Sequence, residues 1–138
     1  VSVAYDLDEA VSRADIVSCA TMSQEPLLRS AAVRPGTHVD LVGAYRPDMR
    51  EADSDLVRKA EVFVDTRRGA LSEAGDLAIP VREGVFHPSD VRGDLSDLSS
   101  GRHPGRRSAD EVTLFKSVGH ALEDLVAASL VYDAMNRT

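Results

Sequence analysis

Three short apolar segments recur along the first half of the chain, and loop or helical sequence separates them. They span 15–20, 37–42 and 61–65, and each is rich in β-branched residues. Segments of this length and composition are typical of strands. Strands that alternate with helices predict βα units joined into a parallel sheet. The pattern therefore indicates an α/β fold rather than an all-helical or all-β one.

Helical patterns fill the intervals between these strands. Asp6 is a candidate N-cap for a helix over 7–14. Pro47, with Asp48 and Glu51 at the spacing of a capping box, predicts the start of another helix. Its buried face would consist of Ala52, Leu56, Val57 and Ala60.

Further helices are expected over 25–33 and 67–74, with the second ending at Gly75. Glycines and prolines divide residues 79–110 into short pieces, among which 91–98 is amphipathic and 101–107 is a basic surface loop. A strand over 111–116 then precedes a long amphipathic helix that runs from Gly119 to about Arg137.

The composition of the chain excludes several kinds of binding partner. The 138 residues carry a formal net charge of −7, which argues against binding to nucleic acid or anionic lipid. The single cysteine, Cys19, excludes an internal disulfide and is expected to be a small core residue, and the four histidines show no metal-ligand spacing. No apolar run reaches the length of a membrane span, so we expect a cytoplasmic protein with no membrane partner.

Candidate ligand contacts follow the predicted strands, because parallel α/β sheets bind ligands beyond the carboxyl ends of their strands. Gly43 and Ala44 would let a ligand approach the backbone, or they form an ordinary tight turn. Thr21 would bond a nucleotide or cap the next segment. Lys116 and Ser117 make a second small-residue turn, in which Ser117 could be only an N-cap. An Asp65–Arg67 ion pair is favoured over an acid–base role. The chain has no G-x-G-x-x-G loop for a dinucleotide.

Several motifs resemble, in order, those of the ornithine cyclodeaminase/mu-crystallin family. They are ADIVSCAT at 14–21, PGTHVDLVGAYRPDMRE at 35–51, VDTR at 64–67, EAGD at 73–76, GRRS at 105–108, TLFKSVG at 113–119 and ALED at 121–124. The resemblance implies the second half of a Rossmann-like doubly wound parallel sheet with a long C-terminal helix. Residues 1–110 would form a partial NAD(P)-binding domain whose glycine-rich loop lies upstream. Residues 111–138 would return to a substrate and dimerisation domain.

The resemblance also implies roles for individual residues. Thr21, Val42, Gly43, Ala44, Tyr45 and Ser117 match cofactor-binding positions, and Val118 matches a backbone contact to substrate. The catalytic residue is unknown, because Tyr45 occupies the position of the cyclodeaminase aspartate. Met49 likewise replaces a cofactor-contacting lysine. Both departures count against ornithine deamination.

The segment 42–51 is most similar to the branch that reduces cyclic imino acids such as Δ1-pyrroline-2-carboxylate to proline with NADH or NADPH. The alternatives are ornithine cyclodeaminase, a lyase that forms proline and ammonia, and a non-catalytic mu-crystallin-like binding protein. The expected ligands are NAD or NADP and a small imino or amino acid. The exposed edge of a half sheet predicts a homodimer or a swapped assembly if the chain folds alone. Without the phosphate loop, these 138 residues alone are expected to bind the dinucleotide weakly and to be inactive.

Overall fold

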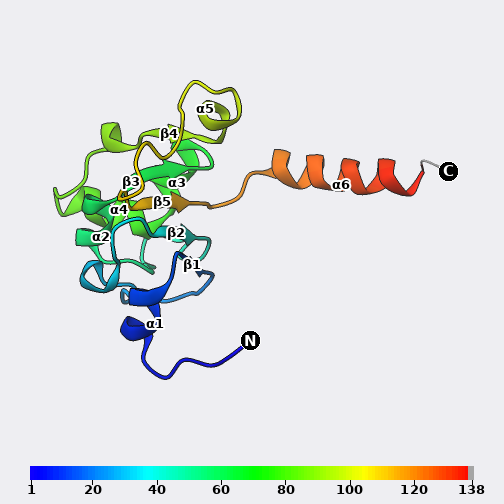
Figure 1. The fold of residues 1–138 in the computed structure, drawn as a ribbon. Coiled ribbons are helices and arrows are strands. Elements are labelled where there is room, and N and C mark those ends of the chain that lie inside the picture. Colours follow the sequence, from blue (N-terminus) through cyan, green and yellow to red (C-terminus); the bar gives the residue numbers. More distant parts are fainter. Residues whose placement is uncertain (137–138) are drawn as a thin grey trace.

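The computed structural model describes residues 1–136, and its centre is a five-stranded sheet (Figure 1). All neighbouring strands are parallel, which confirms the predicted Rossmann-like α/β fold. Along the sheet the strands are β1 (Ile16–Cys19), β2 (His38–Leu41), β5 (Thr113–Lys116), β3 (Glu61–Val64) and β4 (Gly93–Asp94). The C-terminal strand β5 therefore lies in the middle of the sheet, between β2 and β3.

The helices around the sheet agree with the sequence in part. The helix α1 (Leu7–Arg13) begins where Asp6 accepts the N–H of Glu9 at 2.9 Å, as the capping pattern predicts. The helix α3 (Arg67–Glu73) is capped by Thr66. Gly75, expected only to end this helix, begins a further helix, α4 (Gly75–Arg82). The pieces predicted after residue 79 include the 3₁₀ turn η2 (Pro88–Asp90) and the helix α5 (Leu95–Ser99).

The prediction that a helix begins at Pro47 is wrong. The helix α2 (Ser54–Lys59) begins later, where Asp53 accepts the N–H of Leu56 at 2.7 Å. Residues ahead of it are held as a loop because the side chain of Asp76 accepts the N–H of Glu51 at 2.6 Å. A carboxylate on a different helix has thus replaced the local capping box.

The helix predicted over 25–33 is also mostly wrong, because only the 3₁₀ turn η1 (Ser30–Ala32) forms there. Upstream of it, the N–H groups of Leu27 and Leu28 both donate to the carbonyl oxygen of Glu51, at 2.9 and 2.8 Å. Leu28 also forms a parallel bridge with Ala52. These backbone contacts hold the segment in an extended conformation.

The hydrophobic core lies between one face of the sheet and the helices. The strands contribute alternate residues, as expected for a sheet with one face covered. The helices α2 and α4 pack against each other and onto this face. The core includes Val39, Leu41, Val62, Val64 and Leu114 from the strands, Leu56 and Val57 from α2, Ala70 from α3 and Leu77 from α4.

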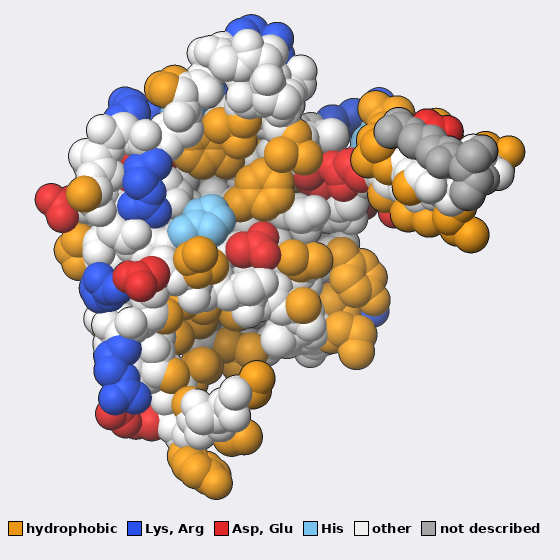
Figure 2. Space-filling model, turned by 45° about the vertical axis from the view of Figure 1, so that its right-hand side comes forward, with side chains coloured by type: hydrophobic (Ala, Val, Ile, Leu, Met, Phe, Trp, Pro, Cys, Tyr) orange, Lys and Arg blue, Asp and Glu red, His pale blue; other side chains and the backbone are white. Residues whose placement is uncertain are grey.

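The opposite face of the sheet is open and apolar. A hollow of about 480 Å³ lies over β2, β5 and β3, and Figure 2 shows hydrophobic side chains gathered there beside a histidine. Its lining includes His38, Phe63, Phe115 and Arg106. The hollow lies on a sheet face, and its lining includes none of the residues that directly follow β1, β2 and β5.

Partial burial at this hollow makes His38 a titrating group in the stability of the fold. Burial, and then Arg106, hold the pKa of His38 below its ordinary value of 6.5, against the pull of Asp40. Because the folded pKa is depressed, the unfolded chain takes up the proton first as the pH falls below 6.5. We expect urea unfolding to show wild-type stability falling relative to His38→Gln below that pH. Parallel curves for the two proteins would contradict this account.

The helix α6 (Ala121–Met135) projects away from the sheet and packs on nothing in residues 1–136 (Figure 1). Its exposed apolar side chains are Leu122, Leu125, Val126, Leu130, Val131, Tyr132 and Met135. The predicted end near Arg137 lies outside the described residues. None of the described helices is both long enough and apolar enough to cross a membrane.

Candidate functional site

The sheet brings the predicted cofactor residues to one edge. Thr21 follows β1, Val42–Tyr45 follow β2 and Ser117 follows β5, and these strands are neighbours. The N–H of Ala44 donates to the carbonyl oxygen of Thr21 at 3.1 Å, and the N–H of Ser117 donates to that of Leu41 at 3.0 Å. We call Thr21, Val42, Gly43, Ala44, Tyr45 and Ser117 the strand-end edge.

The turn after β2 is the most constrained part of this edge. Gly43 packs so closely on β1 that a Cβ there would lie 2.0 Å from the carbonyl oxygen of Thr21. Ala44 is fully buried and has a φ of 48°, the left-handed region that residues other than glycine seldom adopt. Val42 and Tyr45 on either side are 48% and 50% exposed. The turn therefore buries its small residues and presents its two large side chains to solvent.

The hydroxyl groups at the edge have partners within the chain. Thr21 Oγ1 accepts the N–H of Ser23 at 3.3 Å, which supports the capping role weighed for it. Ser117 Oγ donates to Asp65 Oδ2 at 3.3 Å. The N-cap of α6 is His120, whose ring nitrogen accepts the N–H of Leu122, so Ser117 does not cap that helix.

Asp65, at the end of β3, organises the backbone that follows β5. Its Oδ2 accepts the N–H groups of Val118 at 2.7 Å and Gly119 at 2.8 Å, and its Oδ1 accepts the N–H of Thr66 at 2.6 Å. The expected ion pair with Arg67 is wrong, because Arg67 pairs with Asp97 and donates to the carbonyl oxygen of Val91, while the Asp65 carboxylate accepts from backbone N–H groups and Ser117. Asp65 therefore holds the segment of the predicted substrate contact, Val118.

Removing this carboxylate should loosen the segment after β5. Asp65→Ala is expected to lower the free energy of unfolding by about 2–3 kcal/mol, because it leaves several N–H groups without a charged acceptor. Hydrogen exchange at Val118 and Gly119 should rise beyond the change in global stability. Asp65→Asn, which keeps one acceptor oxygen, should lose less. Equal losses in the two variants would contradict the role of the side-chain acceptor.

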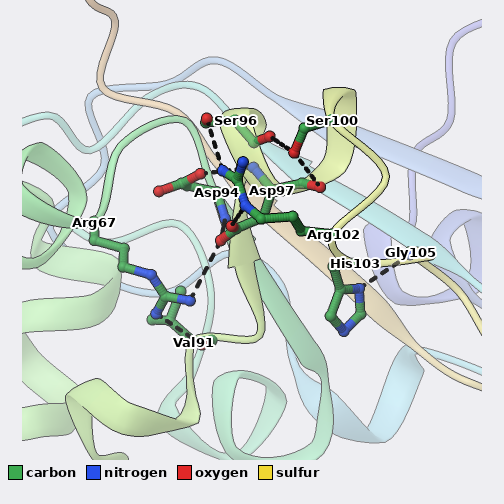
Figure 3. A network of polar contacts seen from close by, with 9 residues as sticks. All are labelled: Arg67, Val91, Asp94, Ser96, Asp97, Ser100, Arg102, His103 and Gly105. Atoms are coloured by element: carbon green, nitrogen blue, oxygen red, sulfur yellow. Dashed lines mark hydrogen bonds and ion pairs between the residues drawn. The ribbon is translucent and has the colours of Figure 1, made fainter.

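The basic loop 101–107 is folded onto α5 and forms ion pairs there. Figure 3 shows Arg67 and Arg102 both reaching Asp97, at 3.7 and 3.0 Å, and Arg67 also donates to the carbonyl oxygen of Val91. The arginines hold the pKa of Asp97 below its ordinary value, Arg102 most strongly. Further along the loop, Arg106 donates to Thr113 Oγ1 at the start of β5, and Arg107 forms an ion pair with Glu61 at the start of β3. None of these contacts involves the strand-end edge.

Three buried charged residues were not predicted as part of the site. Glu51, Asp76 and Lys116 are fully buried beneath the turn after β2. Burial raises the pKa of Asp76 despite the opposing pull of Lys116. Burial raises the pKa of nearby Cys19 to about 11, with Glu51 and Asp76 adding to the effect. The sequence contains one sign of this cluster. Lys116 ends a largely apolar strand, two residues after Leu114, so its side chain lies on the same, buried face of the sheet.

A sequence model of the "Ornithine cyclodeaminase/mu-crystallin family" matches residues 1–138. The chain belongs to this family. The match covers every motif quoted above, so the resemblance seen in the sequence is confirmed. The cofactor and substrate roles of individual residues stay predictions.

Relatives of the chain include proteins that are named as reductases. The chain is 48% identical to the Δ1-pyrroline-2-carboxylate reductase of Paracoccus denitrificans over 130 residues, which are 94% of this chain and 41% of the relative. It is 42% identical to mouse ketimine reductase mu-crystallin over 134 residues, 97% of this chain and 40% of the relative.

A solved structure has the same fold as this chain. It is the Δ1-pyrroline-2-carboxylate reductase of Thermococcus litoralis in complex with NADH and L-proline, with a TM-score of 0.88 and 41% identity. The match covers 91% of this chain and 39% of that structure. The chain thus spans about two-fifths of the length of these relatives.

Proposed function

We propose that this chain is the cofactor-facing part of an NAD(P)H-dependent reductase of cyclic imino acids such as Δ1-pyrroline-2-carboxylate. The observation that carries the proposal is the likeness of this chain's fold, with a TM-score of 0.88, to the Thermococcus reductase, whose structure contains NADH and L-proline. Ligands of parallel α/β sheets bind at this end of the strands. The longer protein that contains residues 1–138 would carry the activity.

The residues present fit the nicotinamide end of a dinucleotide. Val42 offers an exposed apolar surface, and Tyr45 and Thr21 offer hydroxyl groups on the same edge. The buried turn at Gly43 and Ala44 keeps this surface in a fixed conformation. When bound, the reduced nicotinamide supplies a hydride to the imine carbon. We infer that Val42 and Tyr45 shape its pocket and that Asp65 orients the backbone of Val118 toward the substrate.

Ornithine cyclodeaminase activity is the second candidate, supported by the family to which the chain belongs. Tyr45 argues against it, since a phenol cannot replace the carboxylate that the resemblance places there. Steady-state kinetics on the longest natural protein containing these residues separates the two. NADH or NADPH oxidation with Δ1-pyrroline-2-carboxylate supports the reductase. Release of proline and ammonia from ornithine, without net cofactor consumption, overturns it.

We further propose that the longer protein is a cytoplasmic homodimer and that residues 111–138 connect the NAD(P)-binding domain to a substrate and dimerisation domain. Two features support an interface: β1 is an edge strand among residues 1–136, with Ile16 69% exposed, and α6 is apolar and unpacked (Figure 2). Light scattering at micromolar concentration should report a dimer. A monomeric protein would contradict this part of the proposal.

A further inference from the structure

Glu51, Asp76 and Lys116 form a buried charge cluster directly behind the strand-end edge. Glu51 lies in the loop before α2, Asp76 in the first turn of α4, and Lys116 at the end of β5. None of the three residues has exposed surface. Three separate parts of the fold therefore place ionisable groups at one point, out of reach of solvent.

The buried charge cluster contacts the backbone of both turns in the strand-end edge. Lys116 Nζ donates to the carbonyl oxygen of Gly43 and lies 3.3 Å from Asp76 Oδ2. Glu51 Oε1 accepts the N–H of Thr21 at 2.5 Å. A Cβ added at Gly43 would lie 2.3 Å from the same Glu51 oxygen, so this carboxylate also packs against the turn after β2.

Asp76 anchors the other two members. Its Oδ1 accepts the N–H groups of Glu51 at 2.6 Å and Ala52 at 3.1 Å, which fixes the backbone from which the Glu51 side chain extends. Its Oδ2 makes the ion pair with Lys116 and accepts no hydrogen bond among the described residues. One polar contact therefore joins the N–H of Thr21 to the Glu51 carboxylate, and others join the Glu51 N–H, through the side chains of Asp76 and Lys116, to the carbonyl oxygen of Gly43.

Stability alone does not account for this arrangement. Buried ion pairs are often no more stabilising than apolar side chains of the same volume, because desolvation offsets their attraction. What charged groups add is a set of donors and acceptors at fixed positions. Here those atoms hold the turn that contains Ala44, whose φ of 48° needs support from its surroundings.

We propose that Glu51, Asp76 and Lys116 are positioning residues for the cofactor, which set the strand-end edge through the N–H of Thr21 and the carbonyl of Gly43. The identity of the ligand in this inference rests on the proposed function, whereas the contacts of the cluster are seen in the structure itself. The cluster itself touches no ligand. It would act by keeping Val42 and Tyr45, on either side of the buried turn, in fixed positions toward the cofactor.

The test compares Glu51→Ala with Glu51→Gln in the longest natural protein containing these residues. Alanine removes the acceptor of the Thr21 N–H, whereas glutamine keeps an acceptor oxygen. We expect the KM for the reduced cofactor to rise about tenfold or more in Glu51→Ala, since small displacements at a binding edge have effects of this size or larger. Glu51→Gln should return it to within about threefold of wild type.

Hydrogen exchange of the apo protein gives a readout that does not depend on activity. Peptides covering 18–24 and 42–47 should exchange faster in Glu51→Ala than the change in global unfolding explains, and should recover in Glu51→Gln. Asp53→Ala is the matched control. It removes the N-cap of α2 and a bond to the N–H of Ser30, so it destabilises the fold without touching the strand-end edge.

The outcomes separate the inference from the proposed function. If Glu51→Ala behaves like Asp53→Ala in cofactor KM and in local exchange, or if glutamine does not rescue it, the positioning role is overturned. If the wild-type protein neither binds nor oxidises the reduced cofactor, the proposed function fails. The exchange data on the apo protein then still decide whether the cluster holds the two turns.

Discussion

Replacing Lys116 with methionine is expected to lower the free energy of unfolding by about 3–5 kcal/mol, the cost of leaving one partner of a buried pair uncompensated. Methionine fills a similar volume, so lost packing adds little. What remains is Asp76, fully buried beside Glu51 without its cation, and a Gly43 carbonyl without its donor. Urea unfolding followed by circular dichroism measures the loss.

Two variants test whether charge is the cause. Lys59→Met removes a lysine at the surface end of α2, where its ammonium donates to the carbonyl oxygen of Val33, and should cost about 1 kcal/mol or less. Adding Asp76→Asn to Lys116→Met removes one of the two buried carboxylates that have lost their cation. The double variant should therefore recover part of the lost free energy of unfolding. A loss below about 1 kcal/mol for Lys116→Met alone would contradict a buried charge cluster that depends on this cation.

Gly43→Ala is expected to destabilise the fold by about 3 kcal/mol, at the upper end of the cost of overpacking. The new Cβ would lie 2.0 Å from the carbonyl oxygen of Thr21 and 2.5 Å from its nitrogen, and neither backbone atom can move without separating β1 from β2. Thermal unfolding of the variant measures the effect, and cofactor binding should weaken with it.

Gly84→Ala is the matched control for this substitution. Gly84 has a φ of +73° but no atom within 4 Å of an added Cβ, so alanine there meets strain and no clash. We expect a loss of about 1 kcal/mol, the usual cost of an unfavourable left-handed residue. Equal losses in the two variants would show that the contact between Gly43 and Thr21 is not tight.

The parallel sheet could be predicted because its strands are short, apolar and separated by helical sequence. Each strand can be recognised from its own residues, without knowledge of what it contacts. The helix expected at Pro47 fails because its capping residues meet a distant partner: Asp76 takes the N–H of Glu51, and Asp53 caps α2 instead. The spacing of residues within one segment cannot predict a hydrogen bond such as that between Asp76 and Glu51, which lie far apart in the chain.

In the candidate site, too, features that depend on local sequence could be predicted, whereas contacts between distant residues could not. Thr21, Gly43 and Ser117 could be placed at one edge because each follows a strand of a parallel sheet. The polar partners behind them come from α4, from the loop before α2 and from β3, and the sequence does not say that these meet. The sequence predicts that Asp65 pairs with its neighbour Arg67, whereas in the structure it accepts the N–H groups of Val118 and Gly119 after β5.

The most direct test of the proposed function follows the hydride itself. The longest natural protein containing these residues is incubated with Δ1-pyrroline-2-carboxylate and NADH or NADPH that carries deuterium at the transferred position of C4. The account predicts proline with one deuterium on the α-carbon and a stoichiometric amount of oxidised cofactor. Proline without deuterium would contradict it. So would the absence of proline from Δ1-pyrroline-2-carboxylate together with release of proline and ammonia in a parallel incubation with ornithine.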